Sequence, residues 1–223
     1  MKTNPAFYKR ILFLLSTMMV MAGVCVQAQD TTAQDGLDER VRTFLNSKKH
    51  QWRDMNVPAS DGRLLYDIIL HNGYTQGLEI GTSTGHSAIW MAWAFSKTGG
   101  KLTTIEIDKS RYREALANFK EAGLLEYIDA RLGDAHKMVK ELQGPFDFVF
   151  SDADKNWYVQ YFKDVSPKLV VGGCFTAHNV RPATQGRGIS GTRAYLAYVQ
   201  GITNYTTTVN NTGGGLAISY KNE

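Results

Sequence analysis

Short apolar segments alternate with amphipathic segments along most of this chain, from residue 77 to residue 176. The apolar segments have the length of strands, whereas the segments between them carry apolar residues at helical spacing. We expect strands at 77–80, 102–107, 128–132, 146–151 and 169–176, and helices at 85–95, 110–122, 135–142 and 157–165. Strands separated by helices pair in parallel and are covered on both faces. The pattern therefore predicts an α/β fold with a Rossmann-like, doubly wound, mostly parallel sheet.

The segments on either side of this alternation extend the fold. Beyond a helix at 192–200, two β-prone runs at 205–209 and 216–220 flank Asn-Asn-Thr-Gly-Gly-Gly, a turn signal that predicts a C-terminal antiparallel hairpin. Ahead of the alternation we expect a helix at 37–52 and a second helix at 62–71. Asp61 stands where a side chain would cap that second helix.

The first 28 residues have the features of an export signal. Lys2, Lys9 and Arg10 precede an apolar run at 11–26, and Val-Gln-Ala at 26–28 suits a cleavage site. The run is shorter than the roughly 20 residues that span a bilayer, so we expect no stable membrane span after cleavage. The prediction is a signal peptide at 1–28 and one domain at 29–223, exported to the periplasm or secreted. If the signal interpretation is wrong, the protein is cytoplasmic.

The charge of the mature chain is close to neutral. Cleavage removes three positive and no negative residues, which lowers the formal net charge from +4 to about +1. A nucleic-acid partner is therefore not expected. Cys174 is then the one remaining cysteine, inside an apolar run, so we expect it to be a buried core residue.

Polar and glycine residues follow the first strands, at the edge where open parallel sheets bind ligands. Gly81 and Gly85 allow close approach of backbone to a ligand, and Glu106 can accept hydrogen bonds from both ribose hydroxyls of a nucleoside cofactor. Asp134 and Ala135 follow the third strand and would line an adenine pocket, or Asp134 caps the next helix. Each motif alone also fits a tight strand-to-helix turn without a ligand.

A second group of polar residues follows the fourth and fifth strands. The stretch Phe-Asp-Phe-Val-Phe-Ser-Asp-Ala-Asp-Lys at 146–155 ends in Asp152 and Lys155, and His178 and Asn179 come after the next strand. These side chains would meet at one edge of the sheet, around a metal and a reacting oxygen. His178 also fits a hydrogen-bonded residue at a strand end, without a ligand.

These motifs, in this order, resemble the class I S-adenosylmethionine-dependent methyltransferases, and specifically the cation-dependent caffeoyl-CoA and catechol O-methyltransferases. The resemblance covers roughly residues 55–179, and its most specific part is the Asp-Ala-Asp-Lys block. It implies S-adenosylmethionine as the methyl donor. It also implies donor contacts from Glu79, Gly81, Thr82, Thr84, Gly85, Ser87, Glu106, Asp134, Ala135 and Asp152.

The resemblance further implies a metal site and a catalytic lysine. Asp152, His178 and Asn179 fall at the metal positions, and Lys155 falls beside the acceptor oxygen, so that Lys155, Asp152 and His178 are the expected catalytic residues. His178 replaces an aspartate of the family. An imidazole with one carboxylate and one amide favours Mn, Fe, Ni or Zn over Mg. A metal-free alternative, with His178 as the general base, stays open.

The function that follows is methyl transfer to a hydroxyl of a small aromatic, catechol-like acceptor. A glycine-rich loop at 181–191 suits a mobile lid over that acceptor. The resemblance also favours a homodimer. The alternative function is an exported, non-catalytic binding protein that retains the nucleoside or aromatic pocket, since a methyl donor made in the cytoplasm has no evident supply outside it.

Overall fold

The computed structural model describes residues 34–52, 55–182 and 190–223. The expected signal peptide at 1–28 and most of the expected lid at 181–191 lie outside these residues. The first described segment is helical over 34–47. None of the helices in the described part of the chain combines the length and apolarity needed to cross a bilayer.

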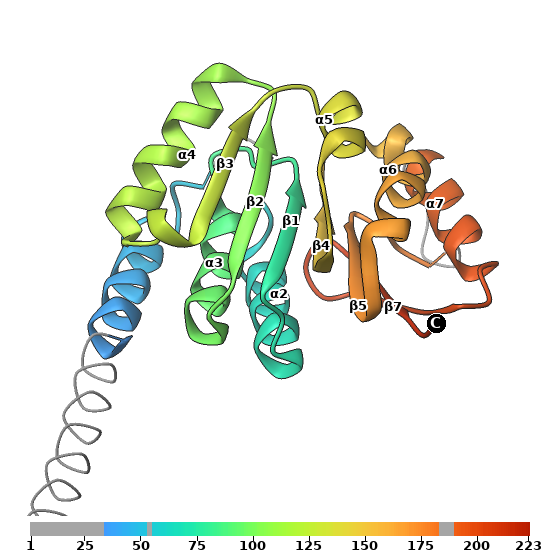
Figure 1. Ribbon diagram of the computed structural model, residues 1–223. Helices are drawn as coiled ribbons and strands as arrows, with labels where there is room; N and C mark the ends of the chain where they lie inside the picture. Colours follow the sequence, from blue (N-terminus) through green and yellow to red (C-terminus); the bar gives the residue numbers. More distant parts are fainter. Residues whose placement is uncertain (1–33, 53–54, 183–189) are drawn as a thin grey trace, which may run out of the picture.

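The described strands form one sheet in the order β3-β2-β1-β4-β5-β7-β6 (Figure 1). Strands β1 to β5 pair in parallel, whereas β7 is antiparallel to both β5 and β6. The predicted α/β fold with a C-terminal antiparallel hairpin is therefore confirmed. The strands are β1 Gln76–Ile80, β2 Lys101–Glu106, β3 Ile128–Leu132, β4 Phe146–Ser151, β5 Leu169–His178, β6 Tyr205–Asn210 and β7 Leu216–Lys221.

Helices cover both faces of the sheet (Figure 1). The α-helices are α2 Ala59–Asn72, α3 His86–Thr98, α4 Lys109–Ala122, α5 Ala135–Glu141, α6 Tyr158–Val165 and α7 Ser190–Gln200. Short 3-10 helices are η1 Leu125–Tyr127, η2 Lys155–Trp157 and η3 Ser166–Lys168. Local signals set several of these bounds. For α4, the Asp108 carboxylate accepts hydrogen bonds from two amides of the first turn, both at 2.8 Å, and Gly123 ends the helix in the left-handed conformation.

The sheet separates two hydrophobic cores, because successive strand residues point to opposite faces. In β4, Phe148 and Phe150 pack with α2, α3 and α4, whereas Val149 packs with α5, α6 and α7. Cys174 is buried in the first of these cores, as its apolar surroundings in the sequence predicted. Because the two cores cover both faces of the sheet, a site is expected at the carboxyl ends of the strands.

The predicted cap of α2 is wrong. The helix begins at Ala59 after Pro58, with no side chain hydrogen-bonded to its first amides, and Asp61 lies inside its first turn. The Asp61 side chain is fully buried instead of facing the helix end. Its carboxylate therefore needs other partners, which come from distant parts of the chain.

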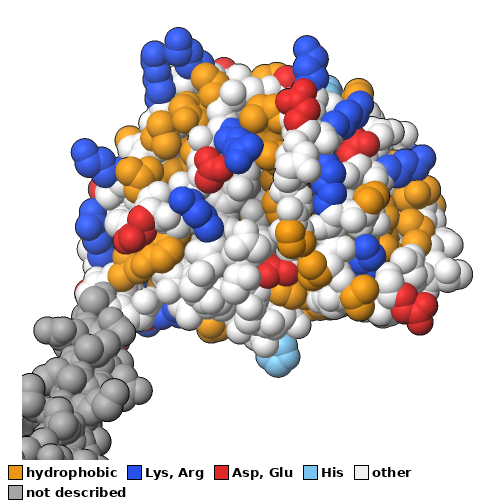
Figure 2. Space-filling view, viewed as in Figure 1, with side chains coloured by type: hydrophobic (Ala, Val, Ile, Leu, Met, Phe, Trp, Pro, Cys, Tyr) orange, Lys and Arg blue, Asp and Glu red, His pale blue; other side chains and the backbone are white. Residues whose placement is uncertain are grey.

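Surface charges on the face drawn in Figure 2 are mixed in sign. Lys and Arg side chains are spread over that face, with Asp and Glu side chains between them (Figure 2). This distribution agrees with the nearly balanced charge of residues 29–223.

Candidate active site

A cavity of about 550 Å³ opens at the carboxyl edge of the sheet. It reaches both groups of polar residues that the sequence singles out. Eight of the predicted site residues line it: Gly81, Glu106, Asp134, Ala135, Asp152, Lys155, His178 and Asn179. The other predicted residues, Glu79, Thr82, Thr84, Gly85 and Ser87, are buried and are not among the described residues that line the cavity.

The turn after β1 passes very close to the backbone after β4. Gly81 has a positive φ of 102°, and a β-carbon there would lie 2.9 Å from the amide nitrogen of Ala153 and 3.0 Å from the carbonyl carbon and oxygen of Asp152. Glycine is therefore required both by the conformation and by the contact. This contact brings the turn after β1 beside Asp152.

Glu106, the last residue of β2, is tied to two backbone amides. One carboxylate oxygen accepts a hydrogen bond from the amide of Ser83 at 2.7 Å, and the other accepts one from the amide of Asp108 at 2.9 Å. A carboxylate has further lone pairs beyond these two bonds. Glu106 thus lies at the cavity wall, fixed in orientation and still able to accept from a ligand hydroxyl.

Glu79 lies behind the cavity and binds neighbouring side chains. Its two oxygens accept hydrogen bonds from the hydroxyls of Ser87 and Thr104, each at 2.5 Å. Burial raises the pKa of Glu79 to about 8, although these hydrogen bonds oppose the shift. In this structure Glu79 holds β1, β2 and α3 together.

Asp134 caps α5, as one of the two interpretations of its position predicted. Its carboxylate accepts a hydrogen bond from the amide of His136 at 3.0 Å, which caps α5, and the residue also lines the cavity. On the same side of the cavity, the ring of His136 stacks on Trp157 with centroids 3.9 Å apart. Tyr158, Tyr161 and Phe162 are core residues of α6, and Tyr161 also reaches the cavity.

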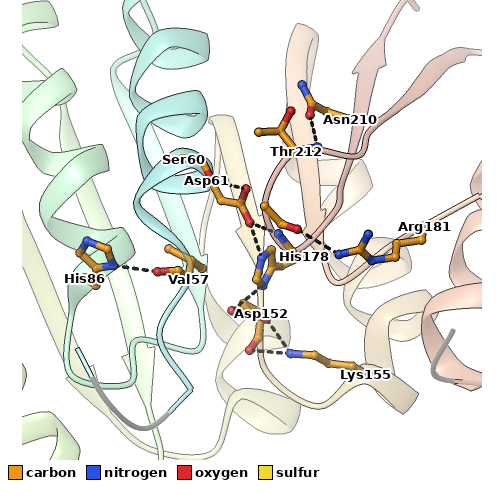
Figure 3. Close-up of polar contacts among 12 residues, drawn as sticks. Val57, Ser60, Asp61, His86, Asp152, Lys155, His178, Arg181, Asn210 and Thr212 are labelled. Carbon is orange, nitrogen blue, oxygen red and sulfur yellow. Dashed lines mark hydrogen bonds and ion pairs between the residues drawn. The ribbon is translucent and has the colours of Figure 1, made fainter. Parts of the chain in front are cut away.

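A chain of charged side chains crosses the other end of the cavity (Figure 3). Nζ of Lys155 donates to Oδ1 of Asp152 at 2.6 Å, and Oδ2 of Asp152 lies 3.2 Å from Nδ1 of His178. Nε2 of His178 lies 2.8 Å from Oδ2 of Asp61. Sequence reasoning missed Asp61, because its local position reads as a helix cap and its partner is 117 residues away.

Two carboxylates surround the ring of His178. Burial alone would lower the pKa of His178, but the hydrogen bonds to Asp152 and Asp61 outweigh burial and raise that pKa to about 9. Nδ1 of the ring faces Oδ2 of Asp152, and Nε2 faces Oδ2 of Asp61.

Asn179 follows His178 at the end of β5. It adopts a positive φ of 58°, a conformation that asparagine tolerates better than most residues, and it lines the cavity beside His178.

Asp152, His178 and Asn179 bring one carboxylate, one imidazole and one amide to this end of the cavity. Among the described residues no three His, Cys, Asp or Glu side chains form a metal cluster, so a site here would depend on the Asn179 amide as its third donor. The separation of 3.2 Å between Nδ1 and Oδ2 suits two ligands of one ion with metal-ligand distances near 2.1 Å. A carboxylate that holds the far nitrogen of a ligating histidine is also the common arrangement around protein metals.

Comparison with known proteins agrees with these features. A family model described as O-methyltransferase matches residues 29–184. Caffeoyl-CoA O-methyltransferase 1 of Eucalyptus globulus is 34% identical over 130 residues, which are 56% of this chain and 52% of that protein. Catechol O-methyltransferase of Niastella koreensis is 43% identical over 90 residues, 39% of this chain and 40% of that protein. The chain thus spans about half or less of the length of these curated relatives.

A solved structure extends the likeness to most of the fold. The O-methyltransferase TomG from Streptomyces achromogenes, solved in complex with SAM, has a TM-score of 0.70 and 26% identity, covering 83% of this chain and 90% of that chain. The family model covers well over half of the sequence, including β2, which ends at Glu106, and β4, which Asp152 follows. This chain belongs to the O-methyltransferase family.

Proposed function

We propose that this protein is an S-adenosylmethionine-dependent O-methyltransferase whose acceptor is a small aromatic, catechol-like hydroxyl compound. The observation that carries the proposal is that one cavity is lined both by Glu106, at the end of β2, and by Lys155, after β4. A nucleoside donor and a hydroxyl acceptor would therefore share one cavity. The likeness to TomG, which was solved with SAM bound, and to the caffeoyl-CoA and catechol O-methyltransferases supports this assignment.

The donor would bind along β1, β2 and β3. Glu106 would accept hydrogen bonds from the ribose hydroxyls through the lone pairs that Ser83 and Asp108 leave available. Asp134 and Ala135 would line the adenine end, and Gly81 would allow the donor to approach the backbone. The buried residues Glu79, Thr82, Thr84, Gly85 and Ser87 would support this wall from behind.

The reaction is an in-line displacement. The acceptor hydroxyl loses its proton to solvent, its oxygen forms a bond to the methyl carbon, and the bond from that carbon to the sulfonium sulfur breaks with its electron pair going to sulfur, which gives an ether and S-adenosylhomocysteine. Lys155 lies at the cavity with its ammonium held by Asp152, where it would stabilise the acceptor oxyanion. The two walls of the cavity would supply the alignment of the two substrates.

A divalent cation at Asp152, His178 and Asn179 belongs to the same proposal. When bound, such an ion would lower the pKa of the acceptor hydroxyl, which for a phenol is about 10 in water. One imidazole nitrogen among the donors favours Mn, Fe, Ni or Zn over Mg.

The experiment is a binding and turnover assay on the purified protein. S-adenosylhomocysteine binding is measured by calorimetry, and a catechol panel with S-adenosylmethionine and each metal in turn is analysed by mass spectrometry for methylated products. We expect binding of the donor product and methylation that depends on the metal added. Absence of donor-product binding would rule out the enzyme, and binding without any turnover would favour the non-catalytic alternative.

We also propose that residues 1–28 direct export. Mass analysis of the protein secreted or released from the periplasm of a bacterial host should show an N-terminus at Gln29. A full-length chain recovered from the cytoplasm would contradict export and would place the protein with the cellular supply of S-adenosylmethionine.

A further inference from the structure

Asp61 is a buried carboxylate whose partners come from the end of β5 and from the turn between β6 and β7. The side chain is fully inaccessible, and Oδ2 accepts hydrogen bonds from Nε2 of His178 at 2.8 Å and from the amide of Gly214 at 2.7 Å. A charge this deep is costly unless it is paired and hydrogen-bonded. Asp61 and His178 therefore stabilise each other in the folded protein.

The bond to Asp61 determines which nitrogen of His178 faces the cavity. With Nε2 donating to Asp61, Nδ1 is the nitrogen directed at Oδ2 of Asp152, 3.2 Å away (Figure 3). The backbone of Gly213 and Gly214 also passes so close to the pair that an added β-carbon would collide with Asp61 at 213 and with His178 at 214. The imidazole consequently has little freedom to turn or flip.

We infer that Asp61 is a positioning residue, which acts through His178 to hold Nδ1 toward the cavity and the metal. This inference rests on the proposed function, because it assumes that Nδ1 serves the acceptor end of the cavity. Accepting from Nε2 fixes the tautomer and orientation of the ring and makes Nδ1 a stronger donor to a metal. Asp61 itself contacts neither the metal nor the substrate.

The test is the affinity of the donor-free and acceptor-free protein for Mn²⁺, measured by calorimetry. Asp61→Asn keeps the size of the side chain and one acceptor oxygen, whereas Asp61→Leu removes the acceptor altogether. We expect Asp61→Asn to weaken Mn²⁺ binding by about 10-fold and Asp61→Leu by about 100-fold, the range seen when such outer partners of a ligating histidine are removed. Equal weakening of Mn²⁺ binding in the two variants would mean that Asp61 acts only through its charge, and this result would overturn the inference.

A matched control comes from the same helix. Asp67 is half exposed and pairs with Arg63 on the outer side of α2, so Asp67→Asn makes the same chemical change away from the cavity. That variant should bind Mn²⁺ as the wild type does. Binding of S-adenosylhomocysteine should be unchanged in all three variants, which shows that the fold and the donor end of the cavity are intact.

Pulsed EPR of bound Mn²⁺ gives a readout that a purely structural role would not change. The wild type should show nitrogen hyperfine coupling from one imidazole, His178→Ala should lose it, and Asp61→Leu should lose or weaken it. Wild-type protein that binds no Mn²⁺, or an Asp61→Asn variant with affinity within twofold of the wild type, would overturn the inference. Because these measurements use no methyl acceptor, they stand even if no methyl transfer is found, and a failure of the proposed function is seen separately in the turnover assay.

Discussion

A β-carbon at position 214 would collide with Nε2 of His178, so Gly214 lets the turn between β6 and β7 close over the ring. The same turn brings the amide of Gly214 to Asp61. The glycines of this turn are therefore packing requirements of the cavity wall as well as turn formers.

The first prediction concerns this contact. Gly214→Ala should push the ring of His178 or the turn aside and destabilise the protein by about 1–3 kcal/mol, as overpacked substitutions do. Thermal unfolding measures the stability, and Mn²⁺ calorimetry measures the effect on the ring. Gly201→Ala is the control, because a β-carbon there meets its nearest neighbour at an ordinary 3.4 Å. Equal unfolding temperatures for the two variants would contradict the described contact.

The second prediction concerns Glu106. Glu106→Gln removes the charge at the end of β2 and replaces one acceptor oxygen by a donor group, so only one of the two amides of Ser83 and Asp108 keeps its acceptor. Hydrogen bonds to charged groups contribute about 1.5–3 kcal/mol, so affinity for S-adenosylhomocysteine should fall about 10- to 100-fold. Calorimetry checks this, and unchanged affinity would place the donor elsewhere.

The third prediction concerns Lys155. Lys155→Met removes the ammonium that Asp152 holds at the cavity, and the turnover number should fall by about 100-fold or more because the acceptor oxyanion loses its stabilising charge. Affinity for S-adenosylhomocysteine should change little. Lys163→Met, an exposed substitution on α6, is the control and should retain turnover. A Lys155→Met enzyme with wild-type turnover would remove this residue from the mechanism.

The fourth prediction concerns the pH dependence of stability. Burial raises the pKa of Glu79 from 4.5 to about 8 in the folded protein. Folding thus favours the protonated carboxyl group of Glu79. The contribution of this group to the free energy of unfolding is complete below pH 4.5 and is lost as the pH rises to about 8. The glutamine side chain in Glu79→Gln does not titrate. As the pH rises across this interval, the free energy of unfolding of the variant should therefore increase by about a few kcal/mol relative to that of the wild type.

Urea unfolding at several pH values between 5 and 8 measures that difference. His50→Gln, an exposed residue outside the sheet, controls for general effects of a substitution. Parallel stability curves for the wild type and Glu79→Gln would show that folding leaves the pKa of Glu79 unchanged, which would contradict the prediction.

The strands were predictable because their signal is local. The expected strand at 146–151 coincides with β4, since Phe148 and Phe150 on one face and Val149 on the other give buried residues in succession. The expected end of β5 at 176 was two residues early. Ala177 and His178 continue the strand because they pair with Ala217 and Leu216 of β7, and a local pattern does not record that pairing.

In the candidate site too, residues with a local sequence signal were predictable, and a residue placed by a long-range contact was not. Glu106, Asp152 and Lys155 were identified because each follows a strand whose end is visible in the sequence. Asp61 was misread, because a carboxylate near a helix start is usually a cap, and only the three-dimensional fold brings it to His178. The histidine at 178 was a recognisable departure from the resemblance, but the partner that accompanies it is not a sequence neighbour.

The antiparallel hairpin of β6 and β7 has a consequence for how this protein is made. Gly214 and Asp61 are hydrogen-bonded across 153 residues, so the end of the cavity beside His178 is complete only when β6 and β7 have joined the sheet. Closing so long a loop is a late and entropically costly event in folding. A chain that has emerged only as far as β4 would therefore lack the contact between Gly214 and Asp61 that closes this end of the cavity.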